Sequence, residues 1–230
     1  MFNRIAERTR YLQYRGSKFV WKGMRALVKL IPSNIVTIPT PYGKFYMPKT
    51  ARVISTMLDL IEPQVQSFFT SFIKTTQVFI DVGAAYGWYT LKAARLMKDG
   101  VIISIEPDEY TYTILKANIR TNRLRNVIPI KAALANKNGY VMLGGKQIPC
   151  RKLDELLDEL SISINKHESL IKIDVEGMAL EVLGGANETI EKRRPKLIIE
   201  LHEGEEKVPI VLKNLSYNVL NLPGNMLIAY

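Results

Sequence analysis

Apolar runs of strand length alternate with helix-period patterns along most of this chain. From residue 77 onward the apolar runs read QVFID, VIISIE, VIPIK, LIKID and KLIIELH. Helical patterns follow Gly87 directly and extend over residues 108–122, 178–193 and 204–215. Strands that are apolar on both faces and are mostly followed by helices predict a parallel sheet of βα units, which is an α/β fold.

The two ends of the chain carry other patterns. The last two runs, YNVLN and MLIAY, are separated by LPG and predict an antiparallel pair at the sheet edge. Upstream, VTIPTPYGKFYMP predicts two extended pieces that turn at Tyr42–Gly43, and a helix is expected within residues 53–72. We therefore predict an N-terminal helical and extended cap, residues 1–75, and one domain over residues 76–230.

Composition agrees with a folded chain of 230 residues, of which 47% are hydrophobic and 23% charged. The single cysteine, Cys150, excludes an internal disulfide framework and a Cys-rich zinc site, so we expect a cytoplasmic location. No window offers the roughly 18 to 20 uncharged apolar residues of a membrane span. Basic residues also interrupt the start too often for the apolar segment of a signal peptide.

The formal net charge of +10 is concentrated near the start, where residues 1–30 contain eight basic residues and one acid. Apolar residues recur among these cations at mostly helical spacing, which predicts one or two basic amphipathic helices. Such a segment could adsorb to anionic lipid, with Phe2, Phe19 and Trp21 in the interface. It could instead bind RNA phosphates, or pack on the core as a cap with its cations in water. The sequence leaves these three alternatives open.

The strand and turn FIDVGAAYGWYT contain the first candidate site. In an open parallel sheet the ligand lies beyond the carboxyl ends of the strands, and the first βα turn lines it. Gly83 and Gly87 allow a sharp turn and a close approach to a ligand, but neither GxGxxG nor GxxxxGK[ST] is present to cradle phosphates. Asp81 at the strand end would repel a phosphate and suit an ammonium group. S-adenosylmethionine is a ligand of that kind.

The second strand ends in Glu106, about 25 residues after Asp81. An acid at that spacing can accept hydrogen bonds from both ribose hydroxyls of a nucleoside. A lone GxxxG or a single strand-terminal acid is also common in purely structural roles, so the prediction depends on their combination. The predicted cofactor site consists of Asp81, Gly83, Ala85, Gly87, Glu106 and Pro107.

Six segments between residues 76 and 202 resemble the FkbM-type S-adenosylmethionine-dependent methyltransferases. They are FIDVGAAYGWYTL, SIEPDEYTYTILKANIRTN, IPIKAAL, KLDELL, LIKIDVEGMALEVLGGA and PKLIIELHE, in that order. The resemblance implies a class I, Rossmann-like fold with a mostly parallel seven-stranded sheet and an antiparallel last strand. It also implies methyl transfer, mostly to hydroxyl groups of sugars, lipids or small metabolites. Asp81, Gly83, Gly87 and Glu106 would hold the cofactor, and Asp174 and Glu176 would face the transferred methyl group or the acceptor.

The chain departs from the family pattern at two positions. Ala85 stands where the family usually has Asn in DVGAN, which removes a polar contact near the methionine end of the cofactor. Ala179 stands where the family's DVEGxE has its second glutamate. Glu181 lies about 200° further round a helix and cannot replace it. A non-catalytic S-adenosylmethionine-binding or partner-binding module is therefore one alternative.

Transfer to a hydroxyl group requires a general base or a metal that takes up the proton. Asp174 and His202 follow neighbouring strands, and we predict that they orient and deprotonate the acceptor, with Glu176 as a third catalytic candidate. Acids at this place also cap helices, and a lone histidine is often structural. Two carboxylates and an imidazole could hold a divalent cation, but without a tighter spacing pattern we predict no metal site.

The predicted function is methyl transfer from S-adenosylmethionine to an oxygen of a glycan, a lipid-linked sugar or a small metabolite. An RNA methyltransferase is the alternative within enzymes, favoured by the basic start and by the basic helix ILKANIRTNRLRN. The chain has no Asn-Pro-Pro-aromatic sequence, so methylation of a base amino group is less well supported.

Overall fold

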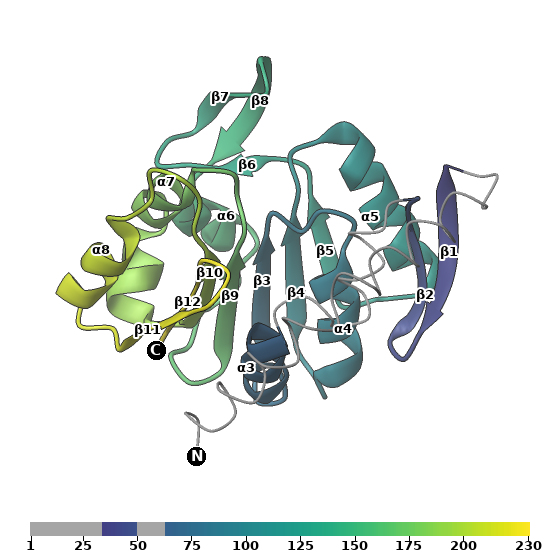
Figure 1. Ribbon diagram of the computed structural model, residues 1–230, viewed down its shortest axis with the longest axis horizontal. Coiled ribbons are helices and arrows are strands. Elements are labelled where there is room, and N and C mark those ends of the chain that lie inside the picture. The colour runs from purple at the N-terminus through teal and green to yellow at the C-terminus, as the bar shows by residue number, and fades with distance from the viewer. Residues whose placement is uncertain (1–33, 50–62) are drawn as a thin grey trace.

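The computed structural model describes residues 34–49 and 63–230 (Figure 1). The basic amphipathic helices predicted for residues 1–30 lie outside the described residues. Within the described part of the chain, no helix is both long and apolar enough to cross a membrane.

A seven-stranded sheet with the order β11-β12-β10-β9-β3-β4-β5 forms the centre of the molecule. β3 pairs in parallel with β4 and β9, and β12 runs antiparallel to β10 and β11. The mostly parallel sheet with an antiparallel last strand is therefore confirmed. Its strands are β3 (Val78–Val82), β4 (Val101–Ile105), β5 (Val127–Ile130), β9 (Ser169–Ile173), β10 (Lys196–Glu200), β11 (Val219–Leu222) and β12 (Met226–Ala229).

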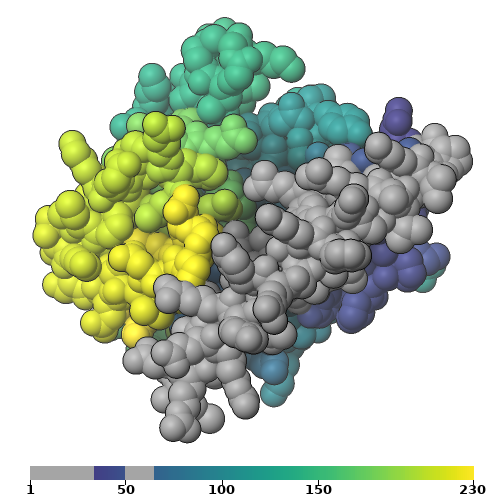
Figure 2. Space-filling model, viewed as in Figure 1, coloured from purple at the N-terminus to yellow at the C-terminus, as the bar shows by residue number. Residues whose placement is uncertain are grey.

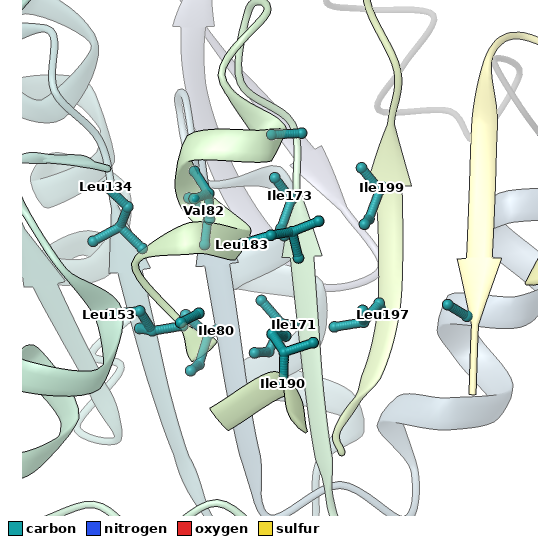
Figure 3. Close-up of a cluster of buried hydrophobic side chains, with 14 of the residues drawn as sticks. Ile80, Val82, Leu134, Leu153, Ile171, Ile173, Leu183, Ile190, Leu197 and Ile199 are labelled. Atoms are coloured by element: carbon teal, nitrogen blue, oxygen red, sulfur yellow. The ribbon is translucent and has the colours of Figure 1, made fainter. Parts of the chain in front are cut away.

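Helices cover both faces of this sheet. Ile80 and Val82 of β3 point into a cluster with α6 (Leu153–Glu159), α7 (Ala179–Gly184) and α8 (Val208–Asn214), part of which Figure 3 shows. Phe79, between them, points into the cluster on the other face, with α3 (Pro63–Ile73), α4 (Trp88–Leu96) and α5 (Glu109–Thr121). Burial on both faces explains why the strand reads as an unbroken apolar run.

The extended part of the predicted cap is a hairpin of β1 (Ile35–Thr40) and β2 (Gly43–Pro48). Two contacts hold this hairpin against the main domain. The side-chain oxygen of Asn118 on α5 accepts a hydrogen bond from the Tyr46 amide at 2.6 Å. Phe45 also lies edge-on to Trp88, with the ring centroids 5.6 Å apart. The separate cap boundary at residue 75 stays a prediction.

The helix predicted over residues 178–193 is wrong as a single helix. α7 ends at Gly184, and a π-helical segment, η1 (Thr189–Arg193), follows. Gly185 interrupts the helix where the chain passes the backbone of Ala135, since a Cβ at Gly185 would lie 2.0 Å from the Ala135 carbonyl oxygen. The carboxylate of Asp154 then accepts hydrogen bonds from the amides of Glu188 and Thr189, and so stabilises a new helix start.

A second, three-stranded sheet was not predicted. It consists of β6 (Ala133–Leu134), β7 (Gly139–Leu143) and β8 (Lys146–Arg151) in the order β6-β8-β7. β7 and β8 form a hairpin that projects beyond the main sheet (Figures 1 and 2). Most of its side chains are exposed or only partly buried, so its sequence lacks the apolar alternation that marks a strand.

Candidate active site

A cavity of about 700 Å³ opens at the carboxyl ends of β3, β4 and β9. This is the edge at which an open parallel sheet binds ligands. The turn after β3, the loop after β4 and the loop after β9 form one part of its wall. Six predicted site residues line it, namely Gly83, Ala85, Glu106, Pro107, Asp174 and Glu176.

The turn after β3 contains positive φ angles, which residues with a side chain rarely adopt. Gly83 has a φ of +75°, and a Cβ there would lie 1.9 Å from the carbonyl oxygen of Asp174. Ala85 also has a positive φ, 48°, which is uncommon for a residue with a side chain. Gly87, with φ 87°, precedes α4 and packs against Leu115 instead of lining the cavity. The turn therefore brings backbone to the cavity and to the end of β9.

Glu106 lies on the cavity wall with its carboxylate held by two backbone amides. One oxygen accepts a hydrogen bond from the amide of Ala85 and the other from that of Asp108, both at 2.9 Å. Burial raises the pKa of Glu106, and these two hydrogen bonds only partly oppose the rise. Because each carboxylate oxygen has two acceptor positions, the group can still accept the two ribose hydroxyls of a nucleoside.

Asp81 precedes the cavity-lining residues Val82 and Gly83 and is not part of the wall itself. Its side chain is buried and accepts a hydrogen bond from the hydroxyl of Thr90 at 2.8 Å. Its second oxygen lies 4.0 Å from the ammonium nitrogen of Lys172. Burial raises the pKa of Asp81, although Lys172 and Thr90 act in the opposite direction. Asp81 thus connects the end of β3 to α4 through Thr90 and to β9 through Lys172.

Lys172 connects Asp81 to Asp174. Its ammonium group donates a hydrogen bond to the Asp174 carboxylate at 2.9 Å. Burial alone would lower the pKa of Lys172, but Asp174 and then Asp81 outweigh it, so the pKa is raised. Burial likewise would raise the pKa of Asp174, yet the Lys172 ammonium prevails and lowers it. A buried cation therefore keeps the Asp174 carboxylate ionised.

Asp174 also faces His202, which follows β10. Nε2 of the imidazole lies 3.9 Å from Oδ1 of Asp174. Glu200 brings a third group, and ligand atoms of Asp174, Glu200 and His202 lie within 4.8 Å of one another. This group has the atom types to hold a cation, whereas Glu176 is not part of it. The structure therefore places Asp174 near His202, while Glu176 lines the cavity outside this group. The catalytic roles of these three residues stay a prediction.

Part of the cavity wall was missed from the sequence. The β7–β8 hairpin contributes Met142, Leu143 and Gly144, and the segment after β5 contributes residues 132–134. Met142 is 66% exposed at this wall, an unusual place for a large apolar side chain. The glycines on either side of it, Gly139 and Gly144, were a weak signal of a hairpin. No local pattern indicates that this hairpin reaches the cavity at the end of β3. Asp108 and Thr111, at the start of α5, also line the cavity.

The comparisons with known proteins agree with this architecture. A model of the methyltransferase FkbM domain matches residues 81–219. The crystal structure of an FkbM methyltransferase from Methylobacillus flagellatus superposes with a TM-score of 0.53 at 17% identity, over 91% of this chain and 58% of that chain. A structure of a SAM-dependent methyltransferase from Agrobacterium tumefaciens superposes with a TM-score of 0.54 at 10% identity, over 87% of this chain and 71% of that chain. These likenesses confirm the class I, Rossmann-like fold.

One curated relative matches over a shorter stretch. It is a tRNA(Phe) (4-demethylwyosine(37)-C(7)) aminocarboxypropyltransferase from Methanocaldococcus jannaschii, 29% identical over 96 residues. That match covers 42% of this chain and 37% of the relative's length. The family model extends over more than half of the sequence and includes the cavity loops after β3, β4 and β9. The chain therefore belongs to the FkbM methyltransferase family, whose cofactor is S-adenosylmethionine.

Proposed function

We propose that this protein transfers a methyl group from S-adenosylmethionine to a hydroxyl oxygen of a glycan, a lipid-linked sugar or a small metabolite. The observation that carries the proposal is the position of Asp174. Its carboxylate lies on the cavity wall, is ionised by the buried Lys172, and has Nε2 of His202 at 3.9 Å. His202 itself does not line the cavity, but its imidazole lies beside the Asp174 carboxylate, which connects it to the cavity wall.

The charge of the cavity wall favours this cofactor. Among the described residues, the wall contains the carboxylates of Glu106, Asp108, Asp174 and Glu176 and no basic side chain. A sulfonium and an ammonium group are attracted to such a wall, whereas a phosphate is repelled. The absence of a phosphate-binding glycine motif in the first turn agrees with this preference.

Each site residue then has a chemical task. Bound S-adenosylmethionine supplies an electrophilic methyl group on sulfur. Glu106 accepts the ribose hydroxyls, and Asp174 accepts a hydrogen bond from the acceptor hydroxyl and so orients its oxygen towards the methyl carbon. His202 takes the hydroxyl proton, since an imidazole is the usual general base near neutral pH. The carbon–oxygen bond would form at the expense of the carbon–sulfur bond, and the cofactor would leave as its neutral thioether.

Methylation of RNA is a second candidate. The curated relative is named for an action on tRNA(Phe), and exposed basic residues lie in the second half of α5 and directly after it. These residues, Lys116, Arg120, Arg123 and Arg125, could contact phosphates outside the acidic cavity. A non-catalytic cofactor-binding module is the remaining alternative, motivated by Ala179.

The test combines binding with transfer. Calorimetric titration with S-adenosylmethionine, its demethylated product, NAD and ATP should show binding of the first two alone. Transfer of a tritiated methyl group is then measured with glycans, lipid-linked sugars, small alcohols and total tRNA. A hydroxyl acceptor whose methylation is lost in Asp174→Asn and His202→Gln supports the proposal. Labelling of tRNA alone favours the second candidate, and cofactor binding without any transfer favours the non-catalytic module.

A further inference from the structure

Glu205 is a buried carboxylate outside the wall of the cavity described above. It lies between β10 and α8 with a relative exposure of 2%. One oxygen accepts a hydrogen bond from the amide of Ala179 at 2.5 Å, and the other accepts one from the amide of His202 at 2.8 Å. A carboxylate is costly to bury unless its oxygens are hydrogen-bonded, and here both are.

The two amides belong to the two loops that carry the acceptor-side residues. Ala179 is the first residue of α7 and ends the loop after β9, which contains Asp174 and Glu176. His202 lies in the loop after β10. The side chain of Met178, which precedes α7, makes no capping hydrogen bond, so the first amide of the helix is satisfied from the other loop. Glu205 therefore joins the two loops through one side chain.

Ala179 itself brings no polar side chain to the start of α7. Its side chain is a single methyl group and is fully buried, and the carboxylate that accepts a hydrogen bond from its amide comes from Glu205 in the other loop. The amide of Glu205 in turn donates a hydrogen bond to the carbonyl oxygen of His202 at 3.2 Å. Both the backbone amide and the backbone carbonyl group of His202 are thus hydrogen-bonded to Glu205.

We propose that Glu205 is a positioning residue of the active site. Its carboxylate fixes the loop after β10 against the loop after β9, and so holds the imidazole of His202 at its distance from the Asp174 carboxylate. The effect on catalysis depends on the proposed function, in which these two groups orient and deprotonate the acceptor. The effect on the position of His202 does not depend on it.

The chain offers a direct readout, because it contains two histidines, His167 and His202. Carbon–proton correlation spectra of the imidazoles, recorded at one fixed pH, therefore report on His202 with His167 as an internal control. Asp174→Asn shows how far the His202 resonance moves when the neighbouring carboxylate is lost. Glu205→Gln is the test variant, since an amide can accept a hydrogen bond from only one of the two backbone amides.

We expect Glu205→Gln to shift the His202 resonance and to leave that of His167 in place. Glu206→Gln is the matched control, because this neighbouring acid is exposed and should shift neither. The dissociation constant for S-adenosylmethionine should stay within about twofold, since Glu106 and the first turn are untouched, while methyl transfer falls by about 10- to 100-fold. If Glu205→Gln does not fold, Glu205→Asp is used, whose carboxylate is one methylene short of spanning both amides.

A folded Glu205 variant with an unchanged His202 resonance would overturn the proposal, even if its stability were lower. If the resonance shifts but no acceptor is ever methylated, the positioning role holds and the proposed function fails. A shift together with a loss of transfer and an unchanged cofactor affinity supports both.

Discussion

Gly83 stands so close to the end of β9 that a Cβ on it would lie 1.9 Å from the carbonyl oxygen of Asp174. The first turn therefore meets the acceptor-side loop backbone to backbone. Gly83→Ala should lower the free energy of unfolding by about 2–4 kcal/mol, through steric overlap added to the cost of a positive φ.

Gly177 provides a matched control for this substitution. Its φ is +74°, almost that of Gly83, but a Cβ there would meet nothing within 4 Å. Gly177→Ala should therefore cost only about 1 kcal/mol, the backbone contribution alone. Urea denaturation of both variants checks the difference, and equal losses would contradict the close contact at Gly83.

Glu106 predicts that cofactor affinity depends on pH. Its pKa is raised above the ordinary 4.5, chiefly by burial, whereas ribose hydroxyls donate hydrogen bonds to the ionised form. Binding therefore favours loss of the proton, and affinity should increase as pH rises from 4.5 through the raised pKa and then level off. Titration calorimetry between pH 4.5 and 7.5 measures this.

In Glu106→Gln the pH dependence should disappear and the affinity should fall by roughly 10- to 100-fold. Glu176→Gln, which changes another carboxylate of the cavity wall, should keep the wild-type profile. A Glu106→Gln protein that still binds more tightly at higher pH would show that a different group titrates.

Ala85 predicts a stabilising substitution. Its φ of 48° lies in the left-handed region, which asparagine adopts more readily than alanine. Ala85→Asn should increase the free energy of unfolding by about 0.5–1 kcal/mol, and Ala85→Val should decrease it, since a branched side chain tolerates this region poorly. Thermal unfolding compares the two, and the opposite order would contradict the φ value.

Lys172 predicts a stability that changes at both ends of the pH range. The pKa of Asp174 lies below its ordinary 3.8, so its contribution is present above pH 3.8 and is lost as pH falls through the lowered value. The pKa of Lys172 lies above its ordinary 10.5, so its contribution is present below pH 10.5 and is lost as pH rises further.

Replacing this lysine should leave two carboxylates without their cation. Lys172→Met is expected to cost about 3–5 kcal/mol at neutral pH, because Asp81 stays buried beside it. Adding Asp81→Asn should recover part of that loss. If the double variant is as unstable as Lys172→Met, charge on Asp81 is not the cause.

Chelation tests the prediction that no metal is required. Asp174, Glu200 and His202 could hold a cation by their atom types, but the Lys172 ammonium already lies 2.9 Å from Asp174. We expect EDTA to leave methyl transfer unchanged. Loss of activity that Mg²⁺ or Mn²⁺ restores would overturn this expectation and assign the cluster to a metal.

The main sheet, and the end of it at which the candidate site lies, could be predicted from the pattern of apolar residues. Each of the seven strands of the main sheet was visible as an apolar run. For the central strands β3 and β9 the reason is burial on both faces, which is detectable from the local sequence alone. The acid at the end of β4 and the glycines after β3 followed from the same pattern. Six of the predicted residues consequently line one cavity.

The contacts of the individual site residues could not be predicted from the sequence, because they depend on how separate segments pack. Asp81 and Gly87 do not line the cavity, whereas Met142 of the β7–β8 hairpin does. Lys172 pairs with Asp81 and Asp174, and Glu205 links two loops. Apart from the Lys172–Asp174 pair, these contacts join segments tens of residues apart, and a single side chain leaves no periodicity in the sequence. The order of the strands is visible in the sequence because each apolar run is a local feature. Which charged side chains pair depends on the packing that brings their segments together.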